Sequence, residues 1–203
     1  MARMDTAVAL VRSYLQANGF FTVSEYPIFE SIGVTTRSVT DVDVLALRFP
    51  GAGGFATDDP TAGLRIVPDP ELELSDGQIE VIIGEVKSGT AELNKAARDP
   101  AVVKAAFRRF GAMDLSVEEQ LVRELIETGT AHHPAGIRLR QMVFATKPPT
   151  EKRYVYRWMD IGNIAEWMRS QVQEHWDQFK TIQSKDPAWG FLLLFEKARR
   201  GEN

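Results

Sequence analysis

Residues Ile79 to Gly89 read IEVIIGEVKSG, an apolar and β-branched run that ends in Glu85, Val86 and Lys87. This composition predicts a core strand whose far end carries charge. Because side chains alternate along a strand, Glu85 and Lys87 project from one face while Val86 turns into the apolar layer behind it. Desolvated charges are costly unless they are paired or bound to a metal, so this end of the strand needs a functional explanation.

An earlier segment, residues 40–47 (TDVDVLAL), supplies two more carboxylates. Strand alternation places Asp41 and Asp43 on one face and the apolar residues between and after them on the other. If the two strands are neighbours, Asp43 and Glu85 converge on one divalent cation with the lysine beside them. The plainer alternative is that Asp41 and Asp43 belong to a solvated strand face.

An Asp on one strand followed by Glu-x-Lys on a later strand resembles the PD-(D/E)xK phosphodiesterase superfamily, which has the restriction-endonuclease-like fold. The order of elements expected from Met4 to about Gly162 is similar to the αβββαβ core of that fold, so the resemblance covers most of the chain. It implies an α/β domain with a central mixed sheet flanked by helices. It also implies a metal-dependent nuclease that hydrolyses phosphodiester bonds, such as a DNA endonuclease in restriction, repair or defence.

The resemblance makes Asp43, Glu85 and Lys87 the catalytic residues. Asp43 and Glu85 are then ligands of Mg²⁺, a hard cation that prefers carboxylate oxygens, with Mn²⁺ as a substitute. The backbone carbonyl of Val86 is a further ligand that the resemblance implies, and Asp41 is a candidate for a second ion or a supporting role. Lys87 either favours deprotonation of the attacking water or stabilises the charge that develops on the phosphate.

The most basic stretch directly follows this strand, from residue 87 to residue 109. Its six basic residues are Lys87, Lys95, Arg98, Lys104, Arg108 and Arg109, against the acidic Glu92 and Asp99. The last five of these basic residues are candidates for binding nucleic acid, because contacts to phosphates supply most of the non-specific affinity. The alternative is an ordinary solvated helix face.

The remaining segments frame this arrangement. Residues 4–18 predict an amphipathic helix that ends before Gly19, and residues 20–29 predict the first strand. Proline and glycine clusters predict an insertion at residues 48–78, either a surface excursion or a flap that faces substrate or a partner. Residues 90–109 predict a helix with a break at Asp99-Pro100.

Further along the chain, residues 116–129 predict a helix, and residues 137–146 and 154–161 predict strands. His132 and His133 fall in a predicted loop, where a metal-binding or catalytic role is the less favoured interpretation. Asn163 is the expected cap of a helix that runs to about Phe179, whose aromatic residues indicate core or a dimer surface. Residues 187–199 leave a final strand and a docking segment both open.

Composition bounds the class of protein. The 203 residues, 44% of them hydrophobic, predict one domain with a helical extension at 163–203. Cysteine is absent, which excludes disulfides and thiolate chemistry. The expected protein is cytoplasmic, without a membrane segment, and it acts on DNA, with RNA left open. Its small size favours a homodimer or a protein partner. The alternative function, which its net charge of −4 and the long insertion suit, is a catalytically silent scaffold or nucleic-acid-binding module.

Overall fold

The chain folds into an α/β structure with one mixed central sheet flanked by helices, described here by a computed structural model that covers residues 5–32, 35–53, 66–75, 77–110, 115–151 and 154–201. The strands are β1 (Phe21–Ile32), β2 (Thr35–Arg48), β3 (Ile79–Thr90), β4 (Thr130–His133), β5 (Ile137–Lys147) and β6 (Arg157–Asp160). The helices are α1 (Thr6–Ala17), α2 (Pro100–Arg109), α3 (Leu115–Thr128), α4 (Ile161–Glu174), α5 (Trp176–Phe179) and α6 (Pro187–Arg200), with the 3-10 turns η1 (Pro70–Leu72) and η2 (Ala96–Arg98).

The sheet has the order β1-β2-β3-β5-β4, and β6 also pairs with β5. β1, β2 and β3 are successive antiparallel neighbours, whereas β3 and β5 run parallel. β4 and β6 share the outer edge of β5: β4 pairs with its first half, up to Arg140, and β6 with its second half, from Met142. The crossover from β3 to β5 is what makes the sheet mixed.

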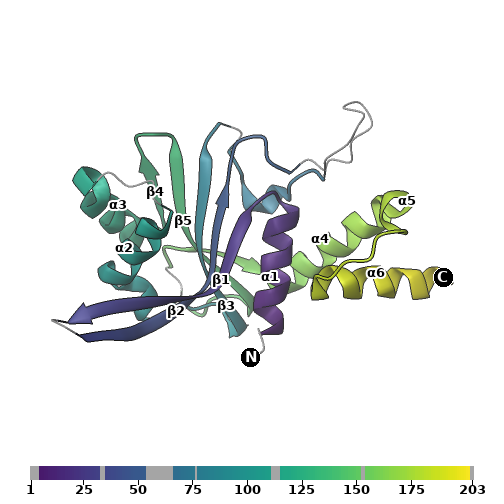
Figure 1. Ribbon diagram of the computed structural model, residues 1–203, viewed down its shortest axis with the longest axis horizontal. Helices are drawn as coiled ribbons and strands as arrows, with labels where there is room; N and C mark the ends of the chain where they lie inside the picture. Colours follow the sequence, from purple (N-terminus) through teal and green to yellow (C-terminus); the bar gives the residue numbers. More distant parts are fainter. Residues whose placement is uncertain are drawn as a thin grey trace.

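Two apolar layers cover the two faces of the sheet. α1 and α4 pack on one face, and α2 and α3 pack on the other (Figure 1). Within β3, the consecutive residues Ile82 and Ile83 pack in the first and the second layer respectively, as expected for a strand that is buried on both faces. The β1–β2 hairpin extends beyond the rest of the sheet, past α2 (Figure 1).

Helix α1 is bounded by two residues that the sequence marks clearly. The Asp5 carboxylate accepts a hydrogen bond from the Ala7 amide at 2.7 Å and so caps the first turn. Gly19 follows the helix with φ of +86°, a conformation that glycine adopts without strain, and a Cβ there would lie 2.9 Å from the backbone carbon of Ala52. The predicted end of the first helix is therefore confirmed, and it is packed against the chain that follows β2.

The described part of the 48–78 segment is fastened to the core. Ile66 and Leu72 are buried, and the Tyr14 hydroxyl donates a hydrogen bond to Asp69 Oδ2 at 2.7 Å. The Asp69 amide donates in turn to Asn18 Oδ1 at 2.7 Å. Residues 66–75 are thus held by helix α1, while residues 54–65 lie outside the described part of the chain.

The segment after β3 differs from the helix predicted for residues 90–109. β3 continues to Thr90, and a single 3-10 turn precedes α2. The Asp99 carboxylate accepts a hydrogen bond from the Ala101 amide at 2.9 Å, and Pro100 occupies the first helical turn. These two residues begin a helix instead of interrupting one.

The start of α4 also differs from the prediction. Asp160, not Asn163, is its cap, because the Asp160 carboxylate accepts from the Gly162 amide at 2.6 Å. α4 ends at Glu174, and α5 is a separate short helix. Residues 187–200, where a strand and a docking segment were both open, form α6, whose cap Asp186 receives a hydrogen bond from Ser13 Oγ of α1 at 2.7 Å.

The alternation of side chains along β2 is broken beside Asp43. Val44 packs in the layer under α1 and α4, but Val42 packs in the opposite layer, under α2 and α3. The strict alternation predicted for this strand is therefore wrong at Val42. The register places Glu25 of β1 across from Asp43, and Glu25 has φ of +51°, a left-handed conformation that costs an L-residue roughly 1–2 kcal/mol. On the two sides of this local irregularity, side chains that alternation would place on one face of the sheet project from opposite faces, in β1 as well as in β2.

Replacing Tyr14 with Phe tests the attachment of residues 66–75. The substitution leaves the buried Asp69 carboxylate without one of its donors, so we expect a loss of about 1–3 kcal/mol in the free energy of unfolding. Urea denaturation measures it, with Tyr154→Phe as the control at a tyrosine that is 42% exposed. An unchanged midpoint for Tyr14→Phe would show that the attachment does not stabilise the fold.

Candidate functional site

The site forms where β2 and β3 stop pairing. Their ladder ends at Val44 and Gly84, one residue before Asp43 and Glu85 would face each other. Beyond this point the Asp43 side chain takes the place of a backbone acceptor, because its Oδ2 accepts a hydrogen bond from the Val86 amide at 2.7 Å. This bond fixes the Asp43 carboxylate at the junction of the two strands.

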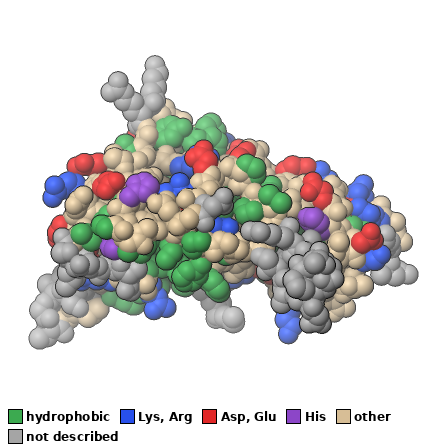
Figure 2. Space-filling model, turned by 90° about the horizontal axis from the view of Figure 1, so that it is seen from above, with side chains coloured by type: hydrophobic (Ala, Val, Ile, Leu, Met, Phe, Trp, Pro, Cys, Tyr) green, Lys and Arg blue, Asp and Glu red, His purple; other side chains and the backbone are tan. Residues whose placement is uncertain are grey.

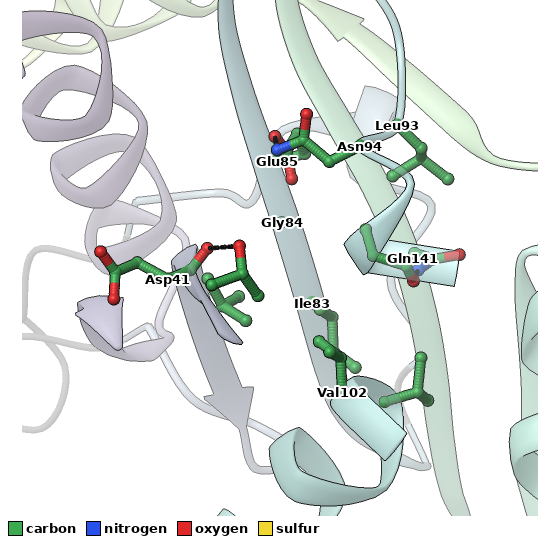
Figure 3. A pocket seen from close by; sticks show the side chains of 12 residues that line it. Asp41, Ile83, Gly84, Glu85, Leu93, Asn94, Val102 and Gln141 are labelled. Atoms are coloured by element: carbon green, nitrogen blue, oxygen red, sulfur yellow. Dashed lines mark hydrogen bonds between the residues drawn. The ribbon is translucent and has the colours of Figure 1, made fainter. Parts of the chain in front are cut away.

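Glu85 and Lys87 share the face of β3 that was predicted for them. Lys87 Nζ donates to Glu85 Oε1 at 2.5 Å, and the Glu85 side chain is only 8% exposed. Asn94, in the segment after β3, donates to the same Glu85 oxygen through Nδ2 and accepts from Lys87 Nζ at 3.2 Å. The Asn94 amide points toward Glu85 in Figure 3. Glu85, Lys87 and Asn94 thus form a closed triangle of hydrogen bonds.

The carboxylates of the site are held in an unfavourable environment for negative charge. Burial raises the pKa of Asp43, and the charges of Asp5 and Glu25 raise it further, against the hydrogen bond from Val86 and the charge of Lys87. Burial likewise raises the pKa of Glu85, and the charge of Asp43 adds to it, while Lys87 opposes both. A cation bound between these oxygens would relieve the strain that burial and mutual repulsion impose.

Asp41 lies apart from this group. It is exposed, and its carboxylate points away from Glu85 (Figure 3). Asp41 nevertheless lines a small hollow with Glu85, Asn94 and Gln141. Gln141 is 1% exposed, and its Oε1 has no hydrogen-bond partner in the part of the chain that the structure describes. The structure therefore brings Asp43, Glu85 and Lys87 together and leaves Asp41 at the margin.

The basic residues proposed for nucleic acid separate into two groups. Arg108 pairs with Glu118 of α3 through Nε at 2.9 Å and Nη2 at 3.0 Å, and Lys104 pairs with Glu119. The Arg109 guanidinium lies 5.3 Å from the centre of the Tyr26 ring. Lys95, which follows Asn94 in the chain and precedes η2, and Arg98, the last residue of η2, are both exposed. Lys104 and Arg108 have nearby counter-charges, whereas Lys95 and Arg98 offer charge beside the site.

His132 and His133 are at the other end of the sheet. They lie on β4, not in the predicted loop, and His133 pairs with Ile137, which also pairs with Ile79 at the start of β3. His133 Nδ1 accepts a hydrogen bond from the Ala135 amide at 3.0 Å, which supports the turn into β5. Their positions do not bring them to Glu85.

The residues at the site fit a hard divalent cation in their chemistry. Asp43 and Glu85 supply carboxylate oxygens from neighbouring strands, and Val86, whose carbonyl is the third expected ligand, lies between Glu85 and Lys87. Within the described ranges, no group of three or more His, Cys, Asp or Glu side chains is close enough to hold a metal ion. Water and substrate oxygens normally complete the coordination of Mg²⁺, so two carboxylates suffice for such a site.

Asn94 is the member of the site that the sequence did not reveal. It lies outside the strands, and its role follows from the way the chain turns back over Glu85 after Thr90. Glu25 lies within the strand predicted at residues 20–29, but its left-handed backbone gave no signal in the sequence. A polar residue a few positions after the Glu-x-Lys strand is the signal that could have indicated Asn94.

Comparisons with known proteins gave no relative: no family model, curated protein or solved structure matches the chain. Across the described residues, none of the helices combines the length and apolar character needed to cross a membrane. The functional argument therefore depends on the geometry of the site.

Replacing Asp43 with Asn tests the electrostatics of the site. Asn keeps an oxygen that can accept from Val86 but removes the charge, so at pH 7 in chelator we expect an increase in the free energy of unfolding. The raised pKa of Asp43 means that its carboxyl group binds a proton more tightly in the folded state than in the unfolded state. The charged Asp43 therefore destabilises the fold above its folded pKa, and this destabilisation disappears as pH falls below 3.8, the ordinary value. Thermal unfolding from pH 3 to pH 8 measures the effect.

The control for this prediction is Asp177→Asn. A hydrogen bond from Lys180 lowers the pKa of Asp177, so its neutralisation should give no stabilisation at pH 7. A less stable Asp43→Asn protein at pH 7 would contradict the assigned repulsion.

Proposed function

We propose that this protein is a metal-dependent nuclease with a restriction-endonuclease-like core, which hydrolyses phosphodiester bonds in DNA. The observation that carries the proposal is the convergence of Asp43 and Glu85, on adjacent strands, with Lys87 in hydrogen-bond contact with Glu85. If Asp43 and Glu85 only formed part of a solvated strand face, their carboxylates would not need to be buried near each other. Their raised pKa values are what a cation site imposes on its ligands before the cation binds.

Each residue has a definite role in this proposal. Asp43 and Glu85 hold Mg²⁺, or Mn²⁺ in its place, with the Val86 carbonyl as a further ligand. The bound cation neutralises phosphate charge and lowers the pKa of water. Lys87 lies beside Glu85, so its ammonium can approach the attacking water or the scissile phosphate. Asn94 restrains both side chains through its amide, which orients them for reaction.

The order of elements supports the same proposal. The chain begins with α1 and three antiparallel strands, and α2 and α3 come next. After the short strand β4, β5 returns to the sheet parallel to β3. This order is compatible with the predicted αβββαβ core. The exposed Lys95 and Arg98 provide basic charge next to the site, as a phosphate backbone requires. RNA has the same backbone chemistry, so the choice between DNA and RNA is made by experiment.

Cleavage assays on supercoiled plasmid, single-stranded DNA and RNA test the function directly. We expect activity with Mg²⁺ or Mn²⁺, none in chelator, and a loss of at least about 100-fold in Asp43→Asn, Glu85→Gln and Lys87→Met, because each removes a group that acts on the reacting atoms. Asp41→Asn should retain most of the activity, since its carboxylate points away from Glu85. Glu174→Gln, at an exposed position of α4, is the matched control for preparation and folding.

Calorimetric titration with Mn²⁺ separates the remaining possibilities. An inactive protein that still binds Mn²⁺ through Asp43 and Glu85 would retain the metal site and contradict the nuclease assignment on the substrates tested. An inactive protein without such binding would support the alternative, a catalytically silent nuclease-like scaffold.

A further inference from the structure

Three arginines gather at the end of the sheet opposite the candidate nuclease site. Arg138 and Arg140 project from β5, and Arg157 begins β6. Arg138 Nη2 lies 2.6 Å and Arg140 Nη2 lies 3.3 Å from the carboxylate of Glu80, and Arg157 Nη1 lies 2.8 Å from that of Glu73. In these ion pairs, two carboxylates face three guanidinium groups.

Arg140 is the least satisfied of the three arginines. It is 4% exposed, and its Nη1 donates a hydrogen bond to the Leu72 carbonyl at 2.7 Å. Among the described residues, its Nε has no hydrogen-bond partner, and its Nη2 has only the 3.3 Å ion pair with Glu80. Burial lowers the pKa of Arg140 to about 10, and Arg138 and Arg157 lower it further against the opposing charge of Glu80. The side chain is still charged at neutral pH, so the cluster retains a desolvated cation that its own carboxylates do not balance.

The arginines line a polar hollow of about 470 Å³ at the edge of the sheet. Thr130, Tyr154 and Trp158 line the same hollow, and Tyr154 is 42% exposed. Volumes of this size are typical of sites for small molecules. Figure 2 looks onto the end of the sheet where β4 turns into β5, and it shows acidic, basic and histidine side chains intermixed there rather than a broad basic surface. A small anion fits such a local hollow better than a long polyanion does.

The Glu73 carboxylate occupies a position on Arg157 that such an anion would take. Its side chain is 66% exposed yet its carboxylate pairs with Arg157, whose own side chain is 35% exposed. Glu80, in contrast, is fully buried and receives hydrogen bonds from Arg138 and from the Ser75 amide. Glu73 can therefore be displaced without unfolding the cluster, whereas Glu80 is part of its structure.

We propose that this hollow binds the phosphate of a mononucleotide, with Arg138 and Arg157 on the phosphate and the base against Tyr154 or Trp158. Guanidinium groups match phosphate oxygens in geometry as well as in charge, and aromatic rings offer a face for a base. Arg140 adds positive charge from behind. Glu80, with which two of the arginines pair, is five residues or about 16 Å before Glu85 along β3, and strand alternation places the two carboxylates on opposite faces of the sheet. The arginine site is therefore distinct from the nuclease site and does not depend on the nuclease proposal.

Calorimetry on the full chain with adenosine 5′-monophosphate, inorganic phosphate and adenosine tests the inference. The titrations are made in chelator and in the Asp43→Asn background, so that the metal site does not contribute. We expect the nucleotide to bind more tightly than inorganic phosphate and adenosine not to bind detectably. Arg157→Gln should weaken nucleotide binding at least tenfold, while Arg123→Gln, at an exposed position of α3, should leave it unchanged.

Glu73→Gln provides a second test, in which the expected result is tighter binding and therefore differs from the loss of binding that misfolding would cause. Removing the competing carboxylate should tighten nucleotide binding several-fold, because Arg157 is then released for the phosphate. The absence of nucleotide binding, or equal binding in wild type and Arg157→Gln, would overturn the site. Equal affinities for the nucleotide and inorganic phosphate would overturn the role of the aromatic rings.

Discussion

The hydrogen bond from the Val86 amide to the Asp43 carboxylate is the contact on which the rest of the site depends. It forms where the β2–β3 ladder ends, so a side chain satisfies a backbone donor that the neighbouring strand no longer reaches. In doing so it holds a carboxylate beside Glu85 in a partly buried place. Burial then makes both groups costly as anions, which is a property that a cation site uses and a purely structural contact does not need.

Strand β3 carries opposite electrostatic imbalances at its two ends. Near its start, two arginines share the one buried carboxylate of Glu80. Near its end, Glu85 lies with Asp43 against the single ammonium of Lys87 among the described contacts. Both ends sacrifice some stability for unbalanced charge, and between them the strand is apolar on both faces. Such trade-offs are expected where a fold places binding groups on a rigid element.

The sequence predicted those features that depend on periodicity and on local caps. The strand around Ile83, the first helix ending before Gly19, and the shared face of Glu85 and Lys87 all follow from alternation or turn chemistry within one segment. The reversed faces at Val42 did not, because they depend on the backbone of Glu25 in another strand. The arginine cluster also depends on how distant segments meet. Such contacts have no signature within a single window of sequence.

The parallel pairing of β3 with β5 has a consequence for the way the chain reaches this structure. β5 can join β3 only after the intervening residues, with α2, α3 and β4, have crossed one face of the sheet. Pairings so distant in sequence require loop-closure entropy before they add stability, so they slow folding. The candidate site lies at the centre of this late-forming sheet. Glu85 therefore gains its cross-strand neighbour Val143 only after this long-range pairing has formed.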